Sequence, residues 1–152
     1  MTEPAIHRGT GVATVVGALS ALYAATFLFG ALLHLGVRVP LGFAVLAEPR
    51  ILPATVVEGL CGLALSVAAW AILARKGWAR TAAIAAHAFA LGGVLLGTAA
   101  LAAGAGPSTD MNTVYHRVML VALAAVLALL LTPAGRASLP GADRSARRES
   151  AG

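Results

Sequence analysis

Apolar residues run through four long stretches of the chain, and polar residues gather between them. The stretches cover about residues 12–36, 53–74, 81–103 and 113–132, and each is long enough for a helix to cross a hydrocarbon core of about 30 Å. A backbone in lipid must satisfy its hydrogen bonds within its own segment, so the pattern predicts an all-α integral membrane four-helix bundle. Short turns would make sequential helices antiparallel neighbours.

The end of the chain has a different character. Residues 134–152 are mostly Arg, Ser, Ala, Gly and Pro, and they offer little apolar surface to bury. This composition is typical of disordered segments, so the transmembrane domain is expected over residues 1–133, followed by a disordered basic tail over 134–152.

Composition narrows the class of protein further. Hydrophobic residues make up 59% of the 152 residues and charged residues only 11%, whereas a soluble domain carries about 25% charged residues. This excludes a soluble globule and a disordered protein, and despite the net charge of +5 it favours no nucleic-acid partner. The expected partner is the lipid bilayer.

The basic residues predict the orientation in that bilayer. With four spans both termini lie on one side, and that side would hold eight of the 11 Lys and Arg residues: Arg8, Arg75, Lys76, Arg80, Arg136, Arg144, Arg147 and Arg148. Basic residues are enriched on the cytoplasmic side of membrane proteins. The sequence therefore predicts a multi-pass protein of the cell inner membrane, with both termini cytoplasmic.

Ionisable residues at membrane depth are costly, so each is a candidate for function. At 1.5 Å per residue, Glu58 would lie about 8 Å below the outer end of its helix. His34, His116 and Arg117 come from two other spans at similar depth, and Tyr115 precedes His116. The sequence thus predicts a polar ligand pocket in the outer half of the bundle.

Two interpretations of Glu58 stay open. It would form a structural ion pair with Arg117 that holds two helices together, or it would handle protons or a ligand. His87 lies near the inner end of the third span and would hydrogen-bond a backbone carbonyl or a hydroxyl such as Ser66 or Thr81. It cannot share the outer pocket.

The same residues raise the question of metal or haem. His34 and His116 would be axial ligands of a haem iron, or would join Glu58 in a three-ligand zinc or copper site. No diagnostic ligand spacing accompanies them, and the sequence has no P-loop, GxGxxG, HExxH or CxxC motif. No metal is therefore assigned, no catalytic residue is named, and an enzyme is not favoured.

Small residues predict where helices approach closely. Gly93 and Gly97 form a small-xxx-small step on the third span, and Gly59 and Gly62 give the second span a similar face. These faces would serve packing within the chain or a homo-oligomer. The apolar loop over residues 37–52 is too short to span and is broken by prolines, so we expect it to fold back over the mouth of the bundle, where Glu48 and Arg50 would reach the pocket.

The stretch Val57-Glu58-Gly59-Leu60-Cys61-Gly62-Leu63-Ala64-Leu65, followed by a short basic turn and an Ala/Gly-rich third span, resembles the DoxX-like membrane proteins. These are small four-helix proteins with a glutamate and glycines early in the second helix, and some are quinone-linked oxidoreductase subunits. Glu58, Gly59 and Gly62 are the residues that match, and the resemblance transfers no catalytic residue.

The leading hypothesis is a small multi-pass inner-membrane protein of unknown activity with a polar pocket in the outer half of the bundle. One alternative is a membrane redox subunit that uses quinone or haem. A second is an oligomeric proton-coupled carrier of small molecules, since four helices leave one chain little room for alternating access. The leading hypothesis needs no cofactor.

Overall fold

The computed structural model describes residues 6–107 and 109–139. Four of its helices are long and apolar enough to cross a membrane, which confirms the four predicted spans to within a few residues. A two-stranded hairpin and a short terminal helix complete the fold. The elements are α1 (Ile6–Leu35), β1 (Val39–Pro40), β2 (Val45–Leu46), α2 (Leu52–Leu73), α3 (Ala79–Ala102), α4 (Asp110–Leu131) and α5 (Pro133–Ser138).

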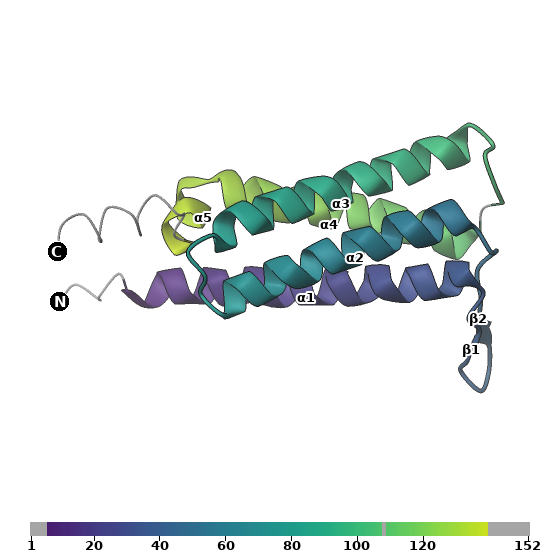
Figure 1. The fold of residues 1–152 in the computed structure, drawn as a ribbon, viewed down its shortest axis with the longest axis horizontal. Helices are drawn as coiled ribbons and strands as arrows, with labels where there is room; N and C mark the ends of the chain where they lie inside the picture. The colour runs from purple at the N-terminus through teal and green to yellow at the C-terminus, as the bar shows by residue number, and fades with distance from the viewer. Residues whose placement is uncertain (1–5, 108, 140–152) are drawn as a thin grey trace.

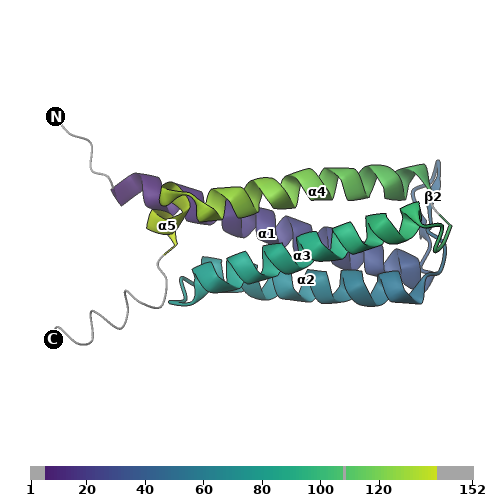
Figure 2. The same cartoon turned by 90° about the horizontal axis from the view of Figure 1, so that it is seen from above.

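The four long helices run antiparallel in sequence order, so α1 packs on α2, α2 on α3 and α3 on α4 (Figure 1). The hairpin and the α3–α4 connection lie at one end of the bundle, which we call the hairpin end. α1 begins and α4 ends at the opposite end, the terminal end, where the α2–α3 turn also lies (Figure 2). There α5 contacts both α1 and α4.

Small side chains lie at the centre of the bundle together with larger ones such as Phe27, Leu65 and Leu123, and many large apolar side chains also cover its outside. Ala68, Ala83 and Ala90 are fully buried, while Leu96 and Val121 are 62% and 72% exposed. Small residues let helix backbones approach closely, and large exposed apolar residues suit contact with lipid tails. The bundle therefore has large apolar side chains both inside and outside, whereas a water-soluble bundle keeps polar side chains on its outside.

Three of the four predicted glycines lie at helix contacts. A Cβ at Gly62 would meet Leu28 on α1, one at Gly93 would meet the Cys61 sulfur, and one at Gly97 would meet His116 on α4. A Cβ at Gly59 would meet no atom within 4 Å. The expectation that Gly59 supports packing is therefore wrong within this chain, because at about 100° per residue Gly59 points away from the sides of α2 that contact α1 and α3.

Two expectations about connecting segments also change. Helix α5 covers Pro133–Ser138, although the disordered tail was expected to begin at residue 134. The Thr132 hydroxyl accepts a hydrogen bond from the Gly135 amide, and Leu139 is 2% exposed. A capping hydroxyl and a buried leucine are enough to order this turn. Residues 140–152 of the expected tail lie outside the described residues.

Only part of the 37–52 loop folds back over the bundle. Residues 39–46 instead form the hairpin, which projects sideways from the hairpin end (Figure 1). Its turn leaves Phe43 90% exposed. Residues 48–51 are the part that crosses the end of the bundle and reaches the polar side chains there.

Candidate functional site

A buried glutamate and histidine meet near the hairpin end of the bundle. Glu58 on α2 is 5% exposed and His34 on α1 is 2% exposed, and the His34 Nε2 lies 3.7 Å from the Glu58 Oε1. This is the pair that the structure forms from the predicted pocket residues. It joins α1 to α2 about two turns from the start of α2.

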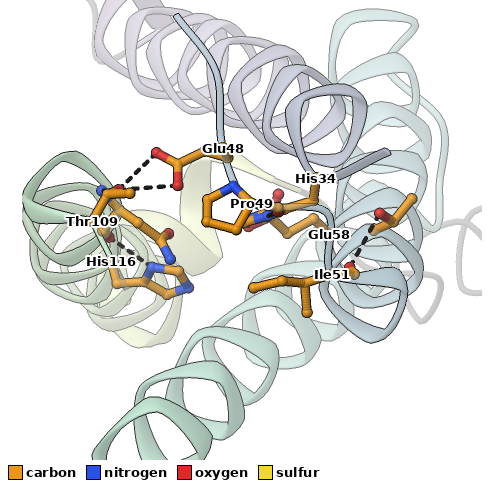
Figure 3. A network of polar contacts seen from close by, with 9 residues as sticks. His34, Glu48, Pro49, Ile51, Glu58, Thr109 and His116 are labelled. Carbon is orange, nitrogen blue, oxygen red and sulfur yellow. Dashed lines mark hydrogen bonds and ion pairs between the residues drawn. The ribbon is translucent and has the colours of Figure 1, made fainter. Parts of the chain in front are cut away.

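The backbone of residues 49–51 fixes the histidine. Its Nδ1 lies 3.0 Å from the Pro49 carbonyl oxygen, and its own carbonyl accepts from the Ile51 amide at 3.1 Å. A carbonyl only accepts, so Nδ1 carries a proton and Nε2 is the nitrogen that faces Glu58. Figure 3 shows this arrangement, with Pro49 and Glu58 on either side of His34. A proton lies between Nε2 and Oε1, either on the histidine ring or on the carboxyl group. Without it, a lone pair of the nitrogen would face a lone pair of the oxygen.

The second oxygen of Glu58 has no such support. Its Oε2 is buried and has no hydrogen-bond partner among the described residues. It points at Gly30 on α1, where an added Cβ would collide with it. Glycine at position 30 therefore makes the room that this carboxylate occupies. Burying a carboxylate oxygen without a donor costs free energy, so a partner from outside the chain would find a favourable contact here.

Glu58 lies on the wall of a cavity of about 340 Å³ between α1 and α4. Most of its surface is apolar, and its polar side chains come from α1, α2, α4 and residue 48. The Tyr115 hydroxyl on this wall is also buried without a hydrogen-bond partner within the described part of the chain. The lining residues are Ala25, Thr26, Phe29, Gly30, Leu33, His34, Glu48, Glu58, Met111, Asn112 and Tyr115.

Glu48 ties the connecting segment to α4 at the mouth of this cavity. The Thr109 hydroxyl lies 2.8 Å and 3.0 Å from the two Glu48 carboxylate oxygens, and it accepts a hydrogen bond from the Asn112 amide (Figure 3). Thr109 is thus the N-cap of α4. A carboxylate beside a helix N-terminus is stabilised by the helix dipole. Residues 48–51 are therefore held to α1 and α4 at once.

A second cavity of about 240 Å³ lies among α2, α3 and α4 at the same end. His34 and Asn112 line both cavities, so they form part of the wall between them. His116 lines only the second one. Its Nδ1 hydrogen-bonds the Asn112 carbonyl at 2.8 Å, and its Nε2 lies against Gly97. His116 is thus close to the buried pair without contacting it.

Arg117 does not join this group. Its side chain is exposed, and the ion pair that Glu58 forms with another described residue is with His34 and not with Arg117. The predicted Glu58–Arg117 contact is therefore not formed. Successive residues on a helix are turned by about 100°, so a helix that turns Tyr115 and His116 toward its neighbours turns Arg117 to the outside.

His87 stands apart, as expected from its depth. Its side chain is fully buried, its Nδ1 bonds the Ala83 carbonyl at 2.8 Å, and its ring meets the Tyr23 ring edge-on at 6.3 Å. This confirms the interpretation of a histidine bound to a backbone carbonyl. It lines neither of the two cavities described above.

The geometry does not favour the three-ligand metal hypothesis. The His34 Nε2 faces Glu58 on α2, whereas the His116 Nε2 lies against Gly97 on α3, and both rings line the second cavity. Among the described residues, no group of three His, Cys, Asp or Glu side chains is placed to hold a metal ion.

Sequence reasoning missed three features of the site. Gly30 lies one turn before His34, so the four-residue spacing alone places both on the same face of α1. The spacing does not show that Gly30 makes room for Glu58. The contact of Glu48 with Thr109 joins segments 61 residues apart, and no local pattern predicts it. Asn112 is 6% exposed and precedes His116 by four residues, so its place beside that histidine was available from helical periodicity.

The fold and the site thus define a class: a four-helix chain with an apolar outside and a buried carboxylate on a cavity wall. No protein-family model, curated protein or solved structure matches this chain. Its function is inferred from the geometry.

Proposed function

We propose that this chain is a multi-pass protein of the cell membrane, with the terminal end of the bundle on the cytoplasmic side. The exposed apolar side chains along all four long helices support insertion into lipid. Basic residues support the orientation. Arg75, Lys76 and Arg80 in or beside the α2–α3 turn and Arg136 in α5 lie toward the terminal end, against Arg38 and Arg50 beside the hairpin and Arg117 in the first half of α4.

Site-directed labelling tests this orientation. Cys61 is the single cysteine, so a Cys61→Ala background allows one new cysteine at a time. A membrane-impermeant maleimide added to intact cells should label Phe43→Cys at the hairpin turn. It should label Ala74→Cys, exposed at the α2–α3 turn, only after the cells are opened. The reverse order of labelling would show the opposite orientation.

We propose further that the cavity between α1 and α4 binds a small molecule with an apolar body and one polar group. The observation that carries this proposal is the buried Oε2 of Glu58, which lacks a partner among the described residues on the wall of a largely apolar cavity. Ligand sites are typically apolar pockets with a few polar groups that fix orientation. Nothing in the arrangement calls for catalysis, so the protein is proposed as a binding protein.

Calorimetry with the neutral probe 2-phenylethanol tests this binding. The protein is placed in nanodiscs of zwitterionic lipid, and the heat from empty nanodiscs is subtracted to remove partitioning. Wild type should bind saturably, and Ala25→Phe, which fills the cavity from its wall, should weaken binding at least about tenfold, or about 1.4 kcal/mol. Ala21→Phe is the matched control, one turn away on α1 and outside the cavity lining.

Equal heats for wild type, Ala25→Phe and Ala21→Phe would mean that the probe enters lipid only. The proposed binding function would then be wrong, while the labelling result would still stand for the orientation.

A further inference from the structure

Acidic side chains outnumber basic ones on the wall of the cavity between α1 and α4, because His34, which faces Glu58, is the one basic residue among the lining residues. Glu48 and Glu58 both line it, and no Lys or Arg is among its lining residues. The nearest arginines in sequence, Arg50 and Arg117, have exposed side chains. The cavity therefore favours a positively charged occupant over a neutral or negative one.

The two carboxylates differ in how far the chain satisfies them. Both oxygens of Glu48 lie within hydrogen-bond distance of the Thr109 hydroxyl. Glu58 has His34 beside Oε1, and its Oε2 has no hydrogen-bond partner among the described residues. Gly30, at which that oxygen points, is itself among the lining residues, so the oxygen lies beside the cavity. Hydrogen bonds from charged donors to a carboxylate are roughly twice as strong as neutral ones.

The remaining wall suits an organic cation. Phe29 and Tyr115 line the cavity, and the face of an aromatic ring attracts a cation. The Tyr115 ring is held edge-on against Phe27, with 6.1 Å between centroids. Ala25, Leu33 and Met111 supply apolar surface for a hydrocarbon body. A bare metal ion would leave this apolar surface unused, and three metal-ligating side chains are not grouped among the described residues.

From the unpartnered Oε2, the two carboxylates and the aromatic wall, we infer that the cavity binds an organic ammonium ion with an apolar body. The ammonium group lies at Glu58 and the body lies between α1 and α4. This inference rests on the proposed binding function and adds the charge of the ligand to it.

Three probes with one carbon skeleton test the charge: phenethylamine, which is protonated at neutral pH, 2-phenylethanol and phenylacetate. Calorimetry in zwitterionic nanodiscs should show that phenethylamine binds wild type about tenfold more tightly than the alcohol does. A tenfold difference in Kd corresponds to about 1.4 kcal/mol of binding free energy. Phenylacetate should show no saturable binding. The ratio of amine to alcohol affinity is measured within each variant, so a general loss of folding does not imitate the effect.

Glu58→Gln should lower the amine-to-alcohol ratio toward one, and Glu48→Gln should lower it by a smaller factor. If Glu58→Gln binds neither probe, the amine-to-alcohol affinity ratio of Glu48→Gln tests the inference instead. A ratio equal to that of wild type overturns the inference. Equal affinity of wild type for amine and alcohol also overturns it and leaves the proposed binding function standing. If none of the three probes binds wild type saturably, the binding function itself fails, and the inference fails with it.

Discussion

The contact between Gly30 and Glu58 gives the sharpest test of how this site is built. The Glu58 Oε2 occupies the place of a side chain at position 30, so Gly30→Ala would drive a methyl group into the carboxylate. The carboxylate has little free space around it, because Glu58 is 5% exposed and lies against the buried His34. The substitution therefore overpacks the interface between α1 and α2.

Two opposing effects set the change in the free energy of unfolding that Gly30→Ala causes. Overpacking of a well-packed interior costs about 1–3 kcal/mol, and replacing glycine by alanine within a helix returns about 1 kcal/mol. We expect Gly30→Ala to lower the free energy of unfolding by up to about 2 kcal/mol, the difference between these two effects. In a Glu58→Ala background the methyl group has room, so the same change should be neutral or stabilising by up to about 1 kcal/mol. The sign of the effect therefore reverses.

The assay is reversible denaturation in detergent micelles, followed by circular dichroism, for the four members of this double-mutant cycle. Gly59→Ala is the matched control, because it is a helical glycine on α2 whose added Cβ meets no atom within 4 Å. It should not destabilise the protein. The coupling between positions 30 and 58 should be about 2 kcal/mol, within the range seen for residues in contact.

Additive effects in the cycle would refute the reasoning, because they would mean that the methyl group and the carboxylate do not compete for one space. A loss of stability in Gly59→Ala as large as that in Gly30→Ala would also refute it. The cost would then belong to helical glycines in general and not to the room that Glu58 needs.

Three further predictions use the same denaturation assay. Gly93→Ala should cost up to about 2 kcal/mol, because its Cβ would meet the Cys61 sulfur at 2.8 Å and the gain from alanine in a helix offsets only about 1 kcal/mol, whereas Gly92→Ala, with no atom within 4 Å, should not destabilise the protein; equal stability of the two would contradict this. Arg117→Ala should change stability by less than about 0.5 kcal/mol because the side chain is exposed, and a large loss would restore the ion pair expected from sequence. Glu48→Ala should cost about 1 kcal/mol, since the carboxylate accepts a hydrogen bond near the N-terminus of α4; unchanged stability would show that this contact contributes nothing.

Depth counted along the helices predicted part of the site from sequence. Glu58 and His34 were expected at similar depth near one end of the bundle. Depth follows from counting residues along a helix, which needs only the rise per residue. Counting does not say which side chains at one depth face each other, and this is why the sequence paired Glu58 with Arg117.

The direction of a side chain around its helix decided that pairing. His34 is held by the Pro49 carbonyl, and that contact depends on how residues 48–51 cross the end of the bundle. The rotation of α4 turns Arg117 outward and leaves Tyr115 on the cavity wall. Helix rotation is set by the fit of all neighbouring side chains at once, so a hydrophobic pattern that is nearly uniform around each helix does not reveal it.

By itself, then, the sequence determined the four apolar helices, their antiparallel order and the depth of each ionisable residue. These properties depend on length, composition and local hydrogen bonding, which each segment carries alone. Only the tertiary structure decided that Glu58 contacts His34, that Gly30 makes room for the carboxylate, and that Glu48 reaches Thr109. Each of these contacts joins two segments distant in the chain, and its existence depends on packing that no single segment contains.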